Sequence, residues 1–115
     1  MKLLTDPIYA KLVRNGRAQA QSEADLDFVP VVKLFTPDAG ATWLLTEADP
    51  TEPDRLFGLC DLGMGYPELG YVSLAELKAI RGRLGLPVER DRYFSPDKPL
   101  SAYLDEALQS GRLVC

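Results

Sequence analysis

The chain has 115 residues, enough for one hydrophobic core but not for two, and 46% apolar against 26% charged residues is typical of a folded protein. A formal net charge of −4 and a pI near 4.8 disfavour nucleic acid as a partner. Histidine is absent, which excludes Ser-His and Cys-His catalysis and removes the commonest zinc ligand.

The sequence also indicates a cellular compartment. No apolar run is long enough to cross a bilayer, and residues 1–12 lack the pattern of a signal peptide. The two cysteines, Cys60 and Cys115, do not form a CxxC pair. We therefore expect a cytoplasmic protein in which both thiols are reduced, with a disulfide as the alternative.

A helix is predicted at the start of the chain. Thr5, followed by an acid and Pro7, is typical of a helix N-terminus. Apolar residues then recur at helical spacing as far as Val13, but the run after Gly16 has no apolar face. The pattern predicts a firm helix of about ten residues with a frayed or exposed continuation, and then an acidic linker over residues 22–27.

Three to four strands are predicted next. Residues 31–36 are β-branched and aromatic, residues 41–48 alternate in character, and the turn between them is short. So short a connection predicts an antiparallel hairpin. After the loop at 49–54, rich in proline and acids, the segment 55–73 predicts a third strand, a glycine-rich turn and a short fourth strand.

A second helix is predicted from Ser73 onward. Ser73 and Glu76 fit a capping box, with serine as the cap and glutamate three residues later. Apolar residues at helical spacing continue to Leu84, and Gly85 and Pro87 then end the helix.

The last part of the chain predicts two further elements. Residues 88–94 form a short charged extended segment, compatible with an edge strand that its charges protect from pairing. A last helix is expected to begin near Asp97 and to end at Ser110, and residues 111–115 are a tail.

This order of elements lacks βαβ alternation and predicts an α+β fold. We expect an antiparallel three- to four-stranded meander sheet with helices packed on one face. The whole chain, 1–115, is expected to form a single domain. Its expected parts are an N-terminal helix and acidic linker (1–27), the antiparallel sheet (28–73), two helices (74–110) and a tail (111–115).

Charge is unevenly distributed along the chain. Residues 1–21 carry a net +3, residues 75–98 a net +2, and residues 22–54 a net −7 from eight acids and one base. A solvated loop face is the simple interpretation of the acidic region. The functional interpretation is an acidic surface that docks on a basic partner, since complementary charge speeds encounter.

The candidate contact residues are acids of the central region together with aromatic side chains expected near the surface. They are Asp38, Trp43, Glu47, Asp49, Glu52, Asp54, Tyr66 and Glu68.

A carboxylate-dependent metal enzyme is one alternative. Asp61, Glu68 and Asp91 lie in or beside predicted strands and turns, and alternation places Asp61 on a partly buried face. A structural ion pair of Asp61 with Arg55 or Arg90 is the simpler expectation. The spacing of the acids shows no D-x-D or similar cluster, so we predict no catalytic residue, no metal site and no cofactor.

A single-stranded nucleic-acid accessory protein is the other alternative. Aromatic side chains on an open sheet can stack on bases, although aromatic residues on strands more often belong to the core. Basic residues are sparse around the second and third strands. The residues of this alternative are Phe35, Trp43, Tyr66, Tyr71 and Tyr93, with Lys11, Arg14, Arg17, Arg90 and Arg92.

Several runs resemble a bacterial family catalogued as domain of unknown function 2958. They are KLFTP with ATWLLTE, FGLCDLG with PELGYVSLAEL, and the later ERD. The resemblance covers about Asp27 to Tyr103. It implies a small bacterial protein of plasmids and other mobile elements, often encoded near antirestriction or DNA-processing genes. It carries over no catalytic residue.

Together these observations lead us to expect a non-enzymatic interaction protein of a mobile genetic element. We expect it to counter a host defence or DNA-processing complex, in the anti-CRISPR or antirestriction manner, by occluding a binding surface. The expected partner is a host protein or a protein–nucleic acid complex. Direct binding of nucleic acid is disfavoured, no membrane is expected, and the choice between monomer and dimer stays open.

Overall fold

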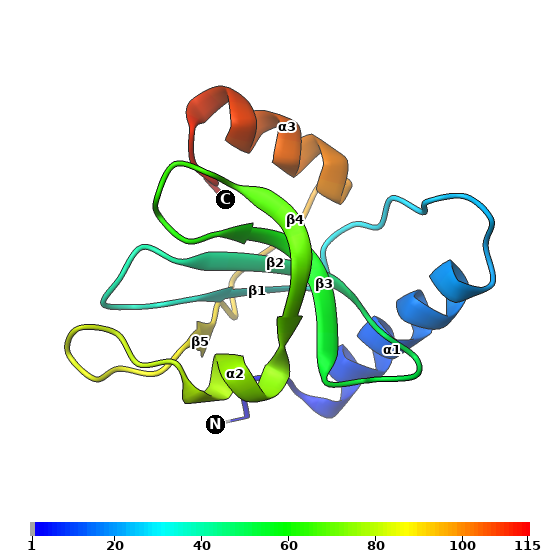
Figure 1. The fold of residues 1–115 in the computed structure, drawn as a ribbon, viewed down its shortest axis with the longest axis horizontal. Helices are drawn as coiled ribbons and strands as arrows, with labels where there is room; N and C mark the ends of the chain where they lie inside the picture. Colours follow the sequence, from blue (N-terminus) through cyan, green and yellow to red (C-terminus); the bar gives the residue numbers. More distant parts are fainter. Residues whose placement is uncertain (1) are drawn as a thin grey trace.

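The computed structural model describes residues 2–115, which form a five-stranded antiparallel sheet and three helices (Figure 1). The elements, in chain order, are α1 (Asp6–Ala20), β1 (Val32–Phe35), β2 (Thr42–Ala48), β3 (Arg55–Asp61), β4 (Glu68–Ser73), α2 (Leu74–Ala79), β5 (Glu89–Arg90) and α3 (Leu100–Ser110). The strands lie in the order β4-β3-β2-β1-β5. Four strands therefore form a meander, and β5 returns to the edge beside β1.

The α+β class and the antiparallel sheet are confirmed. The sheet has one strand more than the three to four predicted, because the charged segment after α2 does pair with β1. Its two pairs are Leu34 with Arg90 and Phe35 with Glu89. β4 and β5 are therefore the two edges of the sheet, and β5 is a charged pair of residues, as short exposed edges often are.

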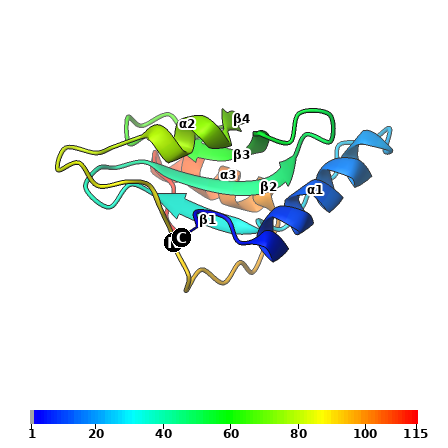
Figure 2. The ribbon, with the colours of Figure 1, turned by 90° about the horizontal axis from the view of Figure 1, so that it is seen from below.

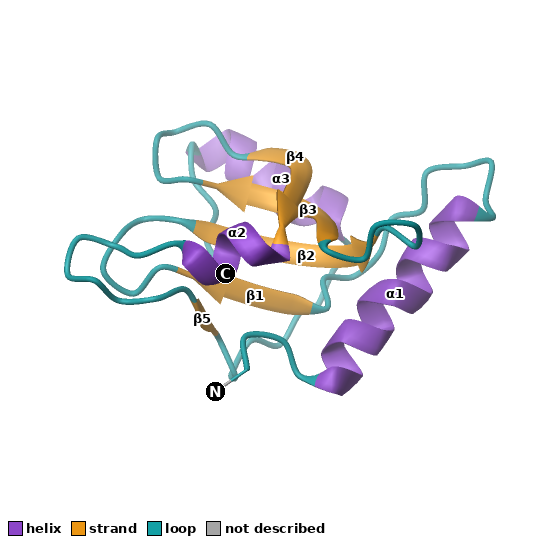
Figure 3. Cartoon of the chain, turned by 60° about the horizontal axis from the view of Figure 1, so that its bottom comes forward, coloured by secondary structure: helices purple, strands orange, loops and turns teal. Residues whose placement is uncertain are grey.

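The helices cover both faces of the sheet. Leu12 of α1 and Leu77 of α2 pack with Leu45 on one face, whereas Tyr103 of α3 packs with Leu44 on the other. Figure 3 shows α2 in front of the sheet and α3 behind it. The sequence predicts all helices on one face of the sheet, and α3 differs from that expectation. Neighbouring residues of a strand point to opposite faces, so an apolar pair such as Leu44 and Leu45 needs cover on both sides.

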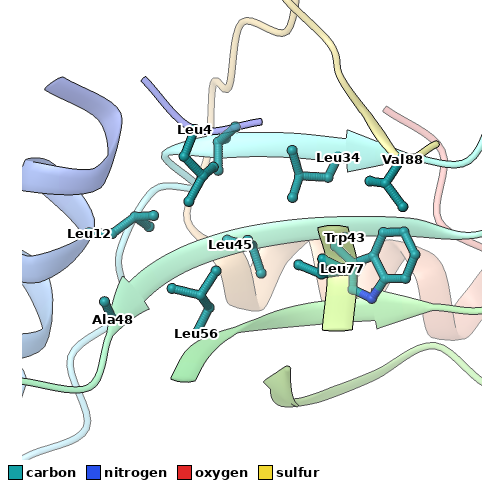
Figure 4. Packing of buried hydrophobic residues seen from close by; sticks show 10 residues of the cluster. Leu4, Leu12, Leu34, Trp43, Leu45, Ala48, Leu56, Leu77 and Val88 are labelled. Carbon is teal, nitrogen blue, oxygen red and sulfur yellow. The ribbon is translucent and has the colours of Figure 1, made fainter. Parts of the chain in front are cut away.

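The larger core lies between the sheet, α1 and α2 (Figure 4). Leu12, Leu45, Leu56 and Leu77 are fully buried in it, and Trp43 is 3% exposed. The smaller core under α3 contains Leu44, Leu59, Leu100 and Tyr103. Apolar burial on this scale is the main term that stabilises the fold.

α1 has 15 residues, and the continuation predicted as frayed or exposed is a regular helix with mostly exposed side chains. It passes through Asn15 and Gly16 without a break and ends at Ala20, inclined against the end of β2 (Figure 2). A Cβ atom at Gly16 would lie 1.7 Å from the carbonyl oxygen of Ala48, so helix and strand backbones touch there. Asn15 Nδ2 also donates to the carbonyl oxygen of Thr46, at 2.8 Å, beside a bulge in β2. Asn15 and Gly16 therefore form a contact between the helix and the strand.

α2 is shorter than predicted. Its capping serine is confirmed, since Ser73 Oγ accepts from the Glu76 amide at 3.3 Å, but the helix ends at Ala79 rather than at Leu84. Asp38 Oδ2 accepts from the amide of Leu84 at 2.7 Å and so holds residues 81–87 as a loop against the β1–β2 turn. The hydrogen bond to the distant Asp38 thus explains why residues 81–84 are not helical despite their helical spacing of apolar residues.

Gly16→Ala is expected to lower the free energy of unfolding by about 1–3 kcal/mol, because the added methyl group overlaps the Ala48 carbonyl. Urea denaturation measures the change. The control Ala18→Gly, on the exposed side of the same helix, should cost about 1 kcal/mol through helix propensity alone. Helix propensity alone would make Gly16→Ala stabilising. A rise in stability would therefore refute the close contact between Gly16 and the Ala48 carbonyl.

Candidate functional site

An open hollow of about 560 Å³ lies on the α3 side of the sheet. It is bounded by residues 25–28, by strands β2 to β4 and by the first half of α3. We call it the Tyr71 hollow. The lining residues that matter below are Asp25, Phe28, Glu47, Phe57, Tyr71 and Leu104.

The aromatic floor of the Tyr71 hollow follows from strand pairing. Phe57 of β3 and Tyr71 of β4 are direct cross-strand partners, so both rings project from the same face. Their centroids are 5.0 Å apart at an interplanar angle of 62°, an edge-to-face arrangement. α3 covers the sheet over β2 and β3, and Tyr71 on the edge strand stays 56% exposed.

The acidic linker forms one wall of the hollow and is held by the two helices beside it. In α1, Gln19 Oε1 accepts from the Leu26 amide at 2.7 Å. Toward α3, the Asp27 carboxylate accepts from the Ser101 amide at 3.1 Å and from the Ser101 hydroxyl. The residue that caps α3, Pro99, has no side-chain acceptor, and Asp27 supplies that acceptor from a distant part of the chain.

Two carboxylates of the hollow are not neutralised. Glu47 projects from β2 beside the bulge and is half-buried, and Asp25 stands on the linker. Burial, and after it the charge of Asp25, raises the pKa of Glu47 above its usual value. Within residues 2–115 neither carboxylate has a hydrogen-bond or ion-pair partner. The fold thus keeps two like charges close together at an apolar surface.

Two further hollows share Tyr71. One, of about 550 Å³, is lined among others by Glu52, Asp54 and Arg55. The other, of about 270 Å³, is lined among others by Glu47 and Asp49. Arg55 is the one base that lines any of the three hollows in the described chain, and its guanidinium carbon lies 4.0 Å from the centroid of the Tyr71 ring.

The structure therefore gathers four of the eight candidate contact residues around Tyr71: Glu47, Asp49, Glu52 and Asp54. The two aspartates also hold local structure. Asp49 accepts from the amide and hydroxyl of Thr51, which holds the pKa of Asp49 below its usual range. Asp54 accepts from Ser73 Oγ at 2.6 Å, next to the start of α2. The two glutamates have no such structural role.

The other four candidates lie elsewhere. Asp38 holds the loop at 81–87, and Tyr66 and Glu68 are exposed at the β3–β4 turn. Trp43 belongs to the core and is not accessible to a partner, which corrects the expectation for this residue. Its strand is buried on both faces, so alternation could not tell an outward position from an inward one.

The aromatic residues of the nucleic-acid alternative do not form one platform. Trp43 is in the core, Tyr71 lies on one edge strand, and Tyr93 follows the strand at the opposite edge. Arg90 Nη1 donates to the carbonyl oxygens of Lys2 and Leu3, each at 2.9 Å, and so anchors the segment before α1.

Asp61 is buried, as its strand position predicted, but it does not form the expected ion pair with Arg55 or Arg90. Its carboxylate accepts from the amides of Gly63 and Leu113, at 2.8 and 2.7 Å. It therefore joins the β3–β4 turn to the segment after α3. In the described part of the chain no three acids or cysteines lie close enough to hold a metal ion.

Both cysteines are free thiols. Burial, followed by the charge of Glu68, raises the pKa of Cys60 to about 11. Cys60 is thus protonated at neutral pH and a poor nucleophile. None of the helices over residues 2–115 has the length and apolar character of a membrane span.

These features define an α+β protein with an open antiparallel sheet, helices on both faces and an acidic surface around one aromatic side chain of an edge strand. The chain matches the model of the family described as "Protein of unknown function (DUF2958)" over residues 3–114, and it belongs to that family. The matched region includes α1 and the segment after α3, beyond the part whose runs carried the resemblance. Searches among curated proteins and among solved structures each gave no match.

Asp61→Ala is expected to lower the free energy of unfolding by about 1–3 kcal/mol, because two amides lose a charged acceptor. Thermal or urea denaturation measures the effect. Asp105→Ala removes an exposed carboxylate of α3 and should stay within about 0.5 kcal/mol of the parent protein. Equal losses in the two variants would show that Asp61 does not anchor the turn and the terminal segment.

Glu47→Gln is expected to raise stability at pH 7. Because the pKa of Glu47 is raised in the folded state, its contribution to stability is fully present below the ordinary value of 4.5 and is lost as pH rises through the folded-state pKa. The advantage of Glu47→Gln over the parent should therefore shrink toward zero below pH 4.5. Urea denaturation at both pH values tests this, and an advantage of equal size at both would contradict it.

Proposed function

We propose that the protein is a non-enzymatic interaction protein that uses the acidic surface around Tyr71 to occupy a basic surface of another protein. The partner is a host protein or protein–nucleic acid complex of the defence or DNA-processing kind. Occupation of its basic surface hides the place where nucleic acid binds. The resemblance to proteins of plasmids and other mobile elements supports an anti-CRISPR or antirestriction role in the cytoplasm.

One observation carries this proposal. The carboxylates of Glu47 and Glu52, which accept no hydrogen bond from the described chain, lie beside the exposed side chain of Tyr71 and its apolar neighbours. An aromatic centre with a charged rim is the usual composition of an energetic hot spot in protein–protein interfaces. A half-buried carboxylate that lacks a partner costs stability, and a cationic partner would offset that cost.

The same surface is poorly suited to nucleic acid. Binding to a phosphate backbone needs several lysines or arginines on one surface. Around Tyr71 the described residues provide only Arg55 against several acids. The bases Lys11, Arg14 and Arg17 lie instead on the exposed side of α1.

The proposal is tested with the purified protein as bait in a bacterial lysate. The parent is compared with Glu47→Gln/Glu52→Gln and with Glu89→Gln/Glu106→Gln, which removes the same charge away from Tyr71. We expect a captured host protein that is lost with the first pair and kept with the second. Added parent protein should also release nucleic acid from that captured complex, which is the signature of occlusion.

Capture that survives Glu47→Gln/Glu52→Gln would contradict the proposal. So would a direct electrophoretic shift of single-stranded nucleic acid that weakens as salt rises, since that result favours the accessory-protein alternative. Turnover that depends on a divalent metal would favour the metal-enzyme alternative instead.

A further inference from the structure

We propose that the Tyr71 hollow receives an arginine side chain from a basic segment of the partner protein. The guanidinium lies against the rings of Tyr71 and Phe57 and donates to the carboxylates of Glu47 and Asp25. This inference rests on the proposed function, because it names the chemical group that the same surface recognises.

Charge is the first argument. Glu47 and Asp25 line one hollow and have no cationic or hydrogen-bonding partner among residues 2–115. Their mutual repulsion contributes to the raised pKa of Glu47. A guanidinium between the two carboxylates would offset their repulsion and would donate charge-assisted hydrogen bonds to both of them.

The aromatic floor is the second argument. An aromatic ring attracts a cation to its face, and guanidinium also stacks on rings because it is planar. The chain already shows this contact: Arg55 lies 4.0 Å from the centroid of the Tyr71 ring. Arg55 belongs to the neighbouring hollow and does not line the Tyr71 hollow, where Phe57 adds a second ring and no described residue adds a cation.

Other ligand chemistries fit less well. Phosphate would meet two carboxylates, and a purely apolar side chain would bury them without compensation. A metal ion needs several converging oxygen atoms, and the described residues offer no such group. Lysine carries the charge but has no planar surface to stack. With a volume of about 560 Å³, the hollow has room for a long side chain and part of its segment.

The test uses a seven-residue peptide with one arginine between two leucines, added to the isotopically labelled protein in an NMR titration. Matched peptides carry citrulline, which is neutral with nearly the same shape, or lysine. We expect amide shifts at residues 25–28, 47, 57, 71 and 104. The citrulline peptide should bind about tenfold more weakly, the ratio expected when one charged pair is lost, and the lysine peptide should fall between the two.

Three variants locate the binding. Glu47→Gln and Tyr71→Ala should each weaken binding of the arginine peptide by about fivefold to tenfold, whereas Glu89→Gln, at the opposite edge of the sheet, should leave it unchanged. Glu47→Gln is informative because it should become more stable while it loses affinity. Loss of affinity through misfolding would lower stability as well.

Several results would overturn the inference. They are equal binding of the arginine and citrulline peptides, shifts confined to residues 49–54, undiminished affinity in Glu47→Gln, or stronger shifts at the hollow with a single-stranded oligonucleotide. If peptide binding depended on Glu52 rather than Glu47, the hollow would not be the arginine site, but the acidic surface would still bind a basic partner. Failure of the lysate experiment with intact peptide binding would refute the proposed function instead.

Discussion

The constraint on which the rest of the structure depends is that β2, at the centre of the sheet, is apolar on both faces. Leu45 needs cover on one side and Leu44 on the other, so no arrangement with all helices on one face would bury both. α1 and α2 fill one side, and α3 alone is left for the other. A single helix cannot cover five strands, and the β4 end of that face stays open. The Tyr71 hollow is the result.

The sequence predicts elements whose signals are local. The Ser73 cap, the first hairpin and the order of strands are examples, because each depends on residues close together in the chain. The sequence could not predict features that depend on contacts between residues far apart in the chain. Gly16 continues a helix because it meets Ala48, and α2 ends early because Asp38 binds the loop beyond it. Asp25 is not recognisable as a site residue from the sequence, because its position depends on the contacts of the linker with Gln19 of α1 and Ser101 of α3.

Between residues 38 and 61 the acids divide by side-chain length. Asp38, Asp49, Asp54 and Asp61 each accept from backbone amides, as short carboxylates often do in turns and caps. Glu47 and Glu52 accept from none in the described chain. Charge density along the sequence indicated the correct region but gave equal weight to acids of both kinds. Turn chemistry at the aspartates is the signal that could have separated structural acids from those left for a partner.

The contact between Gly16 and Ala48 has a consequence for the kinetics of association. α1 positions the linker that carries Asp25, β2 carries Glu47, and the two backbones already touch. The geometry of both carboxylates is thus set before a partner arrives. Little conformational entropy remains to be lost in the encounter, so we expect its rate to depend on diffusion and long-range electrostatic steering rather than on a slow rearrangement of the protein.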